Sequence, residues 1–456
     1  MNYYVFISFL AAIAVVSLIF GKLTSKKASA TYSDFYLSGR SVKFFSLMMT
    51  LLATQFGGGA IIGSSEAAFT SGWMAICYSL GIAIGLVILS LGIGGRFRTL
   101  NISTIPEVFE VAYGSSGLRR FAGLVYIVSM FLILLAVCIA MRKFFYSIGF
   151  TSDMLYIGFW CVVIVYTMFG GLSAVIMADT LQIILVLSLF LIVFFTMDTS
   201  SISLNSELTP SATSIPVISW LLMPCLFTII GQDMGQRCFA AESPRAVFLA
   251  AFGAGVLMVV ASLFPVYLGL MGAEAGLVKG DEGIIMRVIQ LVTNPVMSSL
   301  FAAGILMAIT STANSLLCSI SLNIAMDIPW IRNMPAASSK WVARTVTFIV
   351  GMAAVFGSYL GNDVIPIMLE AYGLTVTAFF VPIIMALIYK RLSWFAGLAS
   401  TIMGTTVFVF ATVLNPDLPD YMPKEVLGLG LSALVFLVVQ GRAERSKTMK
   451  MIELKV

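Results

Sequence analysis

The sequence predicts an all-α integral membrane protein with about thirteen transmembrane helices. The chain has 456 residues, of which 60% are hydrophobic and only 10% are charged. An ordinary soluble domain is about one quarter charged. In addition, thirteen stretches of roughly the 20 apolar residues that cross a bilayer core follow one another along the chain. This pattern excludes a water-soluble globule, a disordered chain and a nucleic-acid-binding protein, and it implies contact with membrane lipids.

The predicted spans are apolar runs separated by short polar loops. The first run lacks the small-residue cleavage site of a signal peptide, so we expect it to remain as a peripheral helix. Six Cys residues are scattered without CxxC spacing and are expected to be small core residues. The spans cover approximately residues 3–21, 44–69, 73–95, 119–141, 154–170, 172–196, 215–238, 245–271, 294–324, 340–360, 364–388, 391–414 and 425–440.

Loop charges predict the orientation of the chain in the cell membrane. Lys and Arg in short loops stay on the cytoplasmic side. An outside N-terminus and a cytoplasmic C-terminus place 21 of the 26 Lys and Arg residues inside, all except Arg142, Lys143, Lys279, Arg287 and Lys424. The opposite orientation would exchange these two counts, so we expect the N-terminus outside.

Residues 273–292 form an external segment in which apolar residues alternate with charges. Leu277, Ile284, Ile285 and Val288 are typical of a short interfacial helix. Two roles are open: a gate over the protein, or a helix that lies on the bilayer surface. The sequence favours the surface helix.

The second span contains three consecutive glycines, Gly57, Gly58 and Gly59. Each glycine costs a helix about 1 kcal/mol relative to Ala. Unpaired backbone inside a membrane is tolerated only against protein or a water-filled cavity. We therefore expect an unwound segment. The alternative is close helix packing, which favours small residues four apart over three in a row.

The seventh span has a matching interruption, with Pro224 followed by Gly231, Gln232 and Asp233. Two interrupted spans that lie five spans apart predict an inverted repeat of five plus five helices, with a solute site where the breaks face each other. Freed carbonyls there can bind a cation, and half-helix N-termini can face an anion. The expected division is residues 1–43 with the peripheral first helix, repeats at 44–197 and 198–389, and 390–456 with two peripheral helices and a cytoplasmic tail.

The ninth span offers oxygen ligands for a hard cation. Ser311 and Thr312 follow Ala308 by three and four residues, so their hydroxyls share one helix face with the Ala308 carbonyl. A hard cation binds several oxygens at once. The alternative is that these hydroxyls bond to the preceding helical turn or to a neighbouring helix.

The sixth span contains Asp179, roughly 10 Å from its cytoplasmic start at 1.5 Å per residue. An ionisable group at this depth indicates function and needs a partner. The sequence places no Lys or Arg at comparable depth, so an inorganic cation or a proton is the expected counter-charge. The alternative is a carboxylate that caps a cytoplasmic vestibule.

These features favour a secondary transporter over an enzyme. His is absent from the chain, and Asp179 is the only aspartate expected deep in a span. An intramembrane hydrolase would need a Ser–His pair or two facing aspartates, so this class is excluded. A solute-binding sensor or a cation-conducting channel on the same scaffold is the remaining alternative.

Four runs of sequence resemble the sodium:solute symporter family: residues 34–40 (DFYLSGR), 170–182 (GGLSAVIMADTLQ), 236–243 (QRCFAAES) and 311–317 (STANSLL). The resemblance extends over nearly the whole chain. It implies a LeuT-like core formed by the second to eleventh spans. It also implies sodium-coupled import of a small polar organic solute by alternating access.

The resemblance implies a principal sodium site and, as in some members of the family, a possible second one. The principal ion would bind the carbonyls of Ala53, Phe56 and Ala308 and the hydroxyls of Ser311 and Thr312. A second ion would bind Asp179, Ser311, Asn314 and Ser315. Asn314 stands where the family usually has a hydroxyl.

The solute would bind beside the two breaks, at Gln55, Gly57, Gly58, Leu132, Gly231, Gln232 and Asp233. The glycine run with Gly63 resembles the choline-transporter branch, although Gln55, Leu132 and Gly231 replace the aromatic residues with which that branch would enclose a quaternary ammonium. Sugar carriers have polar side chains at the positions of Ala60, Gly231 and Phe264.

An amine or an amino acid fits these residues better than a sugar. Gln55 offers an amide beside one break, and Asp233 offers a carboxylate beside the other. The alternative for Asp233 is an ion pair with Arg237, four residues on, at the cytoplasmic end of the helix.

Overall fold

The protein is described by a computed structural model that covers residues 2–9, 11, 32–198, 216–278, 280, 283–389, 391–414, 418–419, 422–445 and 451–453. These residues are almost entirely helical. Ten of the helices in this part of the chain are long and apolar enough to cross a membrane. The predicted all-α, multi-pass membrane fold is therefore confirmed. Most of the first predicted span lies outside the described residues. Within that span, residues 3–9 are described and are helical.

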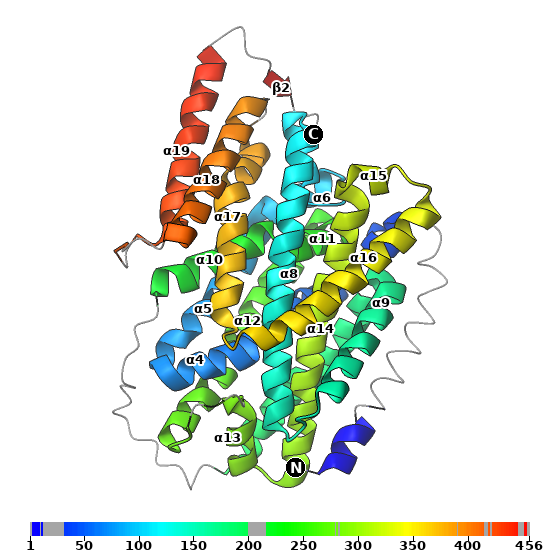
Figure 1. Ribbon diagram of the computed structural model, residues 1–456, viewed down its shortest axis with the longest axis vertical. Coiled ribbons are helices and arrows are strands. Elements are labelled where there is room, and N and C mark those ends of the chain that lie inside the picture. The colour runs from blue at the N-terminus through cyan, green and yellow to red at the C-terminus, as the bar shows by residue number, and fades with distance from the viewer. Residues whose placement is uncertain are drawn as a thin grey trace.

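The elements up to residue 198 include the long helix α8, which packs against α14, α16 and α17 (Figure 1). They are α2 (Tyr32–Leu37), η1 (Ser38–Arg40), α3 (Phe44–Gln55), η2 (Gly59–Gly63), α4 (Ser64–Ser71), η3 (Gly72–Ala75), α5 (Ile76–Ile88), η4 (Leu89–Ile93), α6 (Gly94–Thr99), α7 (Glu107–Tyr113), α8 (Ser116–Ser147) and α9 (Asp153–Thr196).

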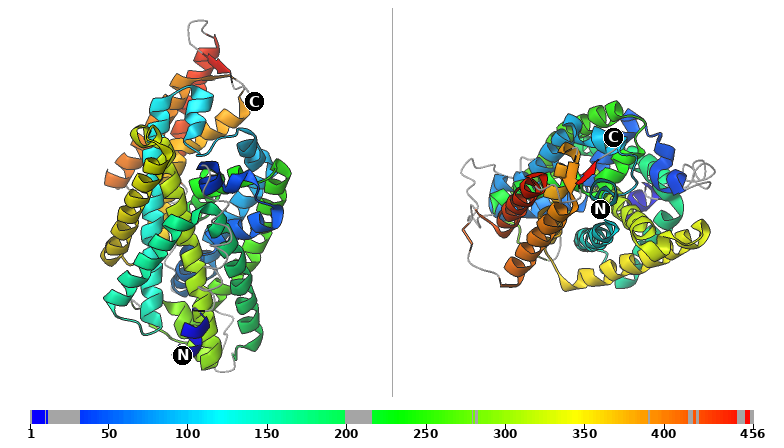
Figure 2. Two further views of the ribbon diagram at one scale, coloured as in Figure 1. Left: turned by 90° about the vertical axis from the view of Figure 1, so that its right-hand side faces the viewer. Right: turned by 90° about the horizontal axis from the view of Figure 1, so that it is seen from above.

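The elements after residue 215 complete the bundle and add a peripheral pair of helices, α18 and α19, which pack on each other and on α17 (Figures 1 and 2). They are α10 (Val217–Ile230), α11 (Gln232–Ala240), α12 (Pro244–Glu274), α13 (Ile284–Val292), α14 (Pro295–Asp327), α15 (Pro329–Arg332), α16 (Ala336–Gly357), η5 (Ser358–Leu360), α17 (Ile365–Ile388), β1 (Arg391–Ser393), α18 (Trp394–Leu414), α19 (Lys424–Arg445) and β2 (Met451–Glu453). The strands β1 and β2 pair antiparallel.

The predicted fifth and sixth spans form α9, in which two helical segments meet at Gly171. Gly171 interrupts its helical conformation with φ 65° and ψ 178°. A Cβ atom at this position would lie 2.8 Å from the Phe35 carbonyl oxygen, so both the conformation and the space require glycine. The two predicted spans are joined at this single residue, as their predicted bounds have it, and Asp179 lies two turns beyond the bend.

The described part of the segment predicted to be external folds onto the protein, which contradicts the favoured helix on the bilayer surface. Its helix, α13, is shorter than expected and buries six of its nine residues: Ile284, Ile285, Met286, Val288, Ile289 and Val292. It packs against α4, α8, α12 and α14. The alternation of apolar residues with charges matched a surface helix, but these apolar residues are covered by protein.

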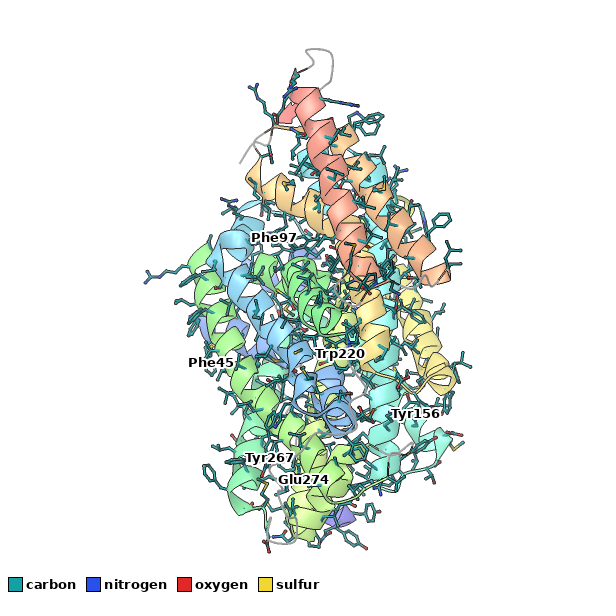
Figure 3. All side chains as sticks on the ribbon, turned by 90° about the vertical axis from the view of Figure 1, so that its left-hand side faces the viewer. Phe45, Phe97, Tyr156, Trp220, Tyr267 and Glu274 are labelled. Atoms are coloured by element: carbon teal, nitrogen blue, oxygen red, sulfur yellow. The ribbon has the colours of Figure 1, made fainter. Side chains whose placement is uncertain are left out.

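Apolar side chains also cover much of the outer surface of the bundle. Phe45, on α3, is 49% exposed and projects from the side of the molecule (Figure 3). By contrast, Phe97 and Tyr156 are buried among the helices. Apolar residues on both the inside and the outside of a helical bundle are typical of a membrane protein, since lipid covers the outer face.

Candidate functional site

The first break lies between α3 and η2. The helix α3 ends at Gln55, and Phe56 leaves the helical conformation with φ −90° and ψ 66°. A Cβ atom at Gly57 would overlap the Thr312 hydroxyl, and one at Gly59 would lie 2.8 Å from the Tyr78 hydroxyl. The sequence left two interpretations of the glycine run open, an unwound segment and close helix packing. Both apply, because the chain unwinds there and α14 and α5 approach its backbone closely.

The second break lies at Gly231, between α10 and α11. Gly231 has an extended conformation, with φ −60° and ψ 138°, whereas Pro224 lies inside α10. The amide of Gly235 donates to the Gly231 carbonyl across 2.8 Å, which starts the new helix. Asp233 is thus the second residue of a half-helix whose N-terminus lies inside the protein.

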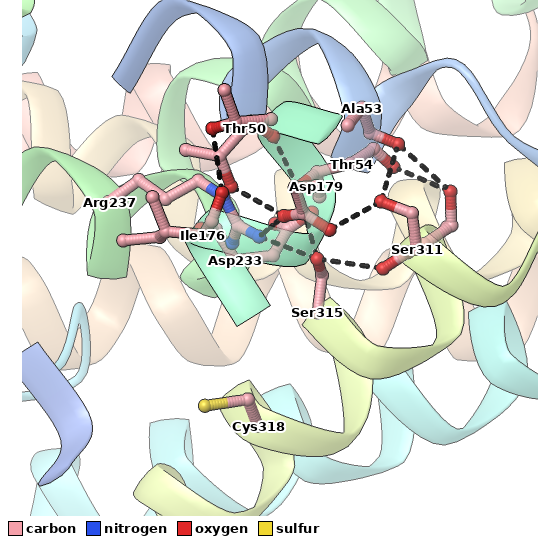
Figure 4. Close-up of polar contacts among 12 residues, drawn as sticks. Thr50, Ala53, Thr54, Ile176, Asp179, Asp233, Arg237, Ser311, Ser315 and Cys318 are labelled. Carbon is pink, nitrogen blue, oxygen red and sulfur yellow. Dashed lines mark hydrogen bonds and ion pairs between the residues drawn. The ribbon is translucent and has the colours of Figure 1, made fainter. Parts of the chain in front are cut away.

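Oxygen atoms from α3 and α14 gather next to the first break (Figure 4). The Thr312 hydroxyl lies 3.0 Å from the Thr54 carbonyl oxygen, 3.4 Å from that of Ala53 and 3.4 Å from that of Ala308. The Ser311 hydroxyl lies 3.5 Å from the Ala53 carbonyl oxygen. This group of oxygens suits a hard cation such as Na+.

The group contains one atom beyond the predicted ligand set. The Thr54 carbonyl belongs to it, although the sequence did not single out that atom. Phe56, a predicted ligand, ends the first half-helix, where its amide donates to the Leu52 carbonyl across 2.8 Å. Its ring packs edge-on against Phe190, with centroids 5.7 Å apart.

Asp179 has a basic partner, which contradicts the expectation that none lies at its depth. Arg237 Nη2 lies 3.2 Å from Asp179 Oδ2, and both side chains are fully buried. The same guanidinium donates to the Thr50 hydroxyl at 2.9 Å and to the Ser315 hydroxyl at 2.5 Å (Figure 4). Position along the span misled the prediction, because Arg237 lies near the end of α11 but points inward between α3 and α14.

Three of the four residues predicted for a second sodium ion come together, and they are already bonded within the protein. Asp179 accepts from Ser311 through Oδ1 and from Thr50 through Oδ2, each at 2.5 Å. The Ser315 hydroxyl donates to the Ser311 carbonyl at 3.0 Å.

Asn314 does not join them, which corrects the predicted set. Its Oδ1 accepts from the Thr167 hydroxyl across 2.6 Å, on the other side of the bend in α9. Successive helix positions differ by about 100°, so a neighbour of Ser315 faces another direction.

A cavity of about 20 Å³ lies between the two breaks. It has room for about one water molecule. Four of the seven residues predicted to bind the solute line it: Gln55, Gly57, Gly58 and Asp233. The rest of its lining consists of Thr54, Gly59, Tyr78, Ile133, Phe227, Thr312, Leu316, Met368 and Tyr372.

The other three predicted solute residues are not part of this lining. Leu132 is half-buried, and the next residue on α8, Ile133, faces the cavity instead. Gln232 Oε1 accepts from the Ile105 amide across 2.7 Å, so its side chain is turned toward the start of α7. A Cβ atom at Gly231 would lie 2.7 Å from Asp233 Oδ1, so this glycine lies next to the carboxyl group.

Three aromatic rings that the sequence analysis missed form one wall of the cavity. Tyr372 stacks on Phe227 with centroids 4.4 Å apart, and its hydroxyl lies 3.0 Å from that of Tyr78. The rings come from α5, α10 and α17, in apolar runs without unusual spacing. No signal in the sequence distinguishes them from core residues.

The alternative role of Asp233 was an ion pair with Arg237 at the cytoplasmic end of the helix. The described structure does not contain this pair. Arg237 is fully buried, and its Nη1 donates to the Asp233 backbone carbonyl across 3.0 Å. The Asp233 side chain is 4% exposed. Its Oδ1 atom, like Gln55 Nε2, has no hydrogen-bond partner in the described part of the chain.

Comparison with known proteins agrees with this architecture. The sequence model of the sodium:solute symporter family matches residues 35–404. The sodium/proline symporter of Haemophilus influenzae is 25% identical over 89% of this chain and 88% of its own. The sodium/pantothenate symporter of the same organism is 23% identical over 96% of each chain. The high affinity choline transporter 1 of Rattus norvegicus is 24% identical over 81% of this chain and 69% of its own.

Solved structures share the fold. A Na+-coupled sialic acid symporter in a substrate-bound outward-open state matches with a TM-score of 0.78, at 19% identity over 99% of both chains. A transporter of the nucleobase-cation-symport-1 family in a closed conformation matches with a TM-score of 0.63, at 16% identity over 91% of this chain and 95% of its own. The family match covers most of the sequence, and the chain therefore belongs to the sodium:solute symporter family, as a sodium-coupled transporter and not an enzyme.

Proposed function

We propose that the protein imports a small polar organic solute together with sodium by alternating access. The observation that carries the proposal is the position of the cavity, which lies between two broken helices and beside a group of oxygen atoms. Broken helices that face each other are typical of solute sites in transporters with inverted repeats. The proline, pantothenate and choline carriers among the relatives support a solute of this class.

The coupling sodium ion binds beside the first break. Its proposed ligands are the carbonyls of Ala53 and Ala308 and the hydroxyls of Ser311 and Thr312, with the Thr54 carbonyl added from the geometry. Phe56 stays a predicted ligand. An ion bound here stabilises the arrangement of α3 and α14 that also encloses the cavity, and this shared preference couples ion and solute.

One sodium ion is transported per cycle on this proposal. At the second predicted site, the Arg237 guanidinium stands in place of an ion and contacts both Asp179 and Ser315. A fixed positive group in contact with the carboxylate takes the place of a mobile cation, and Asn314 supplies no oxygen there.

The proposed topology has thirteen spans, with the N-terminus outside and the C-terminus cytoplasmic. Residues 44–197 and 198–389 form the two five-helix repeats, and residues 1–43 and 390–456 are peripheral. The location of residues 2–9 and of β2 at opposite ends of the long axis supports termini on opposite sides of the membrane (Figures 1 and 2).

Uptake into proteoliposomes tests the proposal against a sensor and a channel. A carrier accumulates solute uphill when sodium is supplied outside, a channel only equilibrates it, and a sensor binds it without uptake. The identity of the sodium ligands is tested by Ser311→Ala/Thr312→Ala, which removes two oxygens from the ion. We expect this variant to require at least about tenfold more sodium for half-maximal uptake.

Thr310→Ala is the matched control for the double variant. The Thr310 hydroxyl bonds only to the Leu306 and Met307 carbonyls of its own helix in the described structure. Its removal should leave the sodium dependence unchanged. A folded double variant with the sodium dependence of the wild type would show that the ion binds elsewhere.

A further inference from the structure

The Asp233 carboxyl group is buried, faces the cavity and makes no ion pair with the side chains that the structure describes. Asp233 lines the cavity, is 4% exposed and has an Oδ1 atom with no hydrogen-bond partner among the described residues. Neither Lys nor Arg is among the residues that line the cavity. The nearby Arg237 directs its guanidinium to Asp179, Thr50 and Ser315, and touches Asp233 only through the backbone carbonyl.

The same carboxylate occupies the place that an anionic solute would take. The N-terminus of a half-helix carries a partial positive charge, and in transporters with broken helices it points at anionic groups of the substrate. Here the second residue of α11 is itself an aspartate, so the charge at the helix start already has its counter-charge. A solute carboxylate placed at this end of the cavity would meet Asp233 and be repelled.

The aromatic wall adds a second preference for positive charge. Phe227 and Tyr372 stack on each other, and Tyr78 joins them through its hydroxyl, all three in the lining of the cavity. The faces of aromatic rings attract ammonium groups, by about 2 kcal/mol or more where water is excluded. Carboxylate and rings therefore act in the same direction on the charge of the solute.

We propose that the transported solute carries a cationic nitrogen, which binds between the Asp233 carboxylate and the rings of Tyr78, Phe227 and Tyr372 once the helices have moved apart to enlarge the cavity. Gln55 Nε2, at the opposite break, donates to an acceptor oxygen of the same solute. Amines, quaternary ammonium compounds and amino acids satisfy this description, whereas sugars and carboxylates without an amine do not. The assignment rests on the proposed function and names the class of solute that the proposed site takes.

Pairs of compounds that differ only in the cationic nitrogen test the assignment. Choline is compared with 3,3-dimethylbutanol, and proline with cyclopentanecarboxylate, within a wider panel of amines and their deaminated analogues. The measurement is the thermal unfolding midpoint of the purified full-length protein, in sodium and in potassium. A ligand that binds only the folded state raises this midpoint. We expect at least one amine, and none of the deaminated analogues, to raise it in sodium.

Asp233→Asn keeps the shape of the side chain and removes its charge. The half-saturating concentration of the bound amine should rise by about tenfold or more, because a charge-assisted contact is lost. Glu370→Gln is the control, since it removes a carboxylate from α17 that pairs with Lys424 away from the cavity. That variant should bind the amine like the wild type.

Three results would overturn the assignment: stabilisation by the deaminated analogues, no stabilisation by any amine, or unchanged amine affinity in Asp233→Asn. In Asp233→Asn, sodium could cease to raise the unfolding midpoint while the affinity for the amine stays unchanged. Asp233 would then be a ligand of an inorganic cation, and the assignment would also be overturned. If Asp233→Asn does not fold, the paired compounds on the wild type still decide. The proposed function fails separately, if no solute is taken up in response to sodium.

Discussion

Arg237 joins four elements at one buried point. Its guanidinium contacts Asp179 of α9, Thr50 of α3 and Ser315 of α14, in addition to the carbonyl of Asp233 on its own helix. Removing an ion from water costs several kcal/mol unless a partner compensates for it. Asp179 and Arg237 are therefore tolerated in the interior only as a pair.

The pair predicts a specific pattern of stability. Asp179→Asn leaves the guanidinium buried without its counter-charge, so we expect the free energy of unfolding to fall by about 3–5 kcal/mol. The double variant Asp179→Asn/Arg237→Gln removes both charges. Its loss in free energy of unfolding should be smaller than the sum of the losses in Asp179→Asn and Arg237→Gln. Thermal unfolding of the four proteins in detergent measures the cycle. Additive losses would show that the two residues do not act as a pair.

The sequence predicted some of these residues better than others. Ala308, Ser311 and Thr312 were predictable because helical spacing alone puts them on one face. The partner of Asp179 was not, since the depth of Arg237 depends on the direction of its side chain and on the packing of α11 against α3 and α14. The aromatic rings of the cavity meet only through contacts between distant spans.

At the scale of the element, the glycine run at the first break sets how closely α14 approaches. A Cβ atom at Gly57 would overlap the hydroxyl of Thr312, one of the proposed sodium ligands. Gly57→Ala should therefore displace that hydroxyl and raise the sodium concentration for half-maximal uptake by about tenfold or more. Sodium titration of uptake in proteoliposomes measures the effect.

A glycine in an open environment provides the comparison. Gly430 lies within α19, and a Cβ atom there would meet no other atom within 4 Å. Gly430→Ala should leave sodium dependence unchanged, because Ala favours the helix and nothing is displaced. Equal behaviour of the two variants would remove the steric argument for Gly57.

Interruptions of the helices were predictable and their environments were not. Consecutive glycines and a glycine followed by polar residues identify both breaks from local chemistry alone. The role of α13 needed tertiary information, because the same pattern of apolar residues suits a lipid surface and a protein surface. The six buried residues of this helix decide between them.

At the scale of the whole molecule, α8 connects the two sides of the membrane. Its 32 residues span about 48 Å at 1.5 Å per residue, more than the bilayer core of about 30 Å. Ser116, at its start, and Thr151, after its end, are both exposed. The proposed orientation places Ser116 in the cytoplasm and Thr151 outside.

Cysteine labelling tests this orientation. The half-buried Cys77 and Cys161 are first replaced by Ser, which leaves the four buried cysteines. In intact cells, a membrane-impermeant maleimide should then label Thr151→Cys, and should label Ser116→Cys only after permeabilisation. The opposite labelling pattern would reverse the topology, and the charge-based prediction with it.

The unpaired charge of Asp233 has an electrical consequence for the transport cycle. On the proposal that Asp233 meets the solute as a carboxylate, Asp179 and Arg237 cancel each other and the empty site carries one net negative charge. One sodium ion makes it neutral, and an amine or quaternary ammonium compound that lacks a carboxylate makes it positive. Voltage acts on a charge that crosses the whole field with about 2.3 kcal/mol per 100 mV. A membrane potential that is negative inside would thus favour the inward movement of the loaded site and the outward return of the empty site. The same potential would therefore drive both halves of the transport cycle.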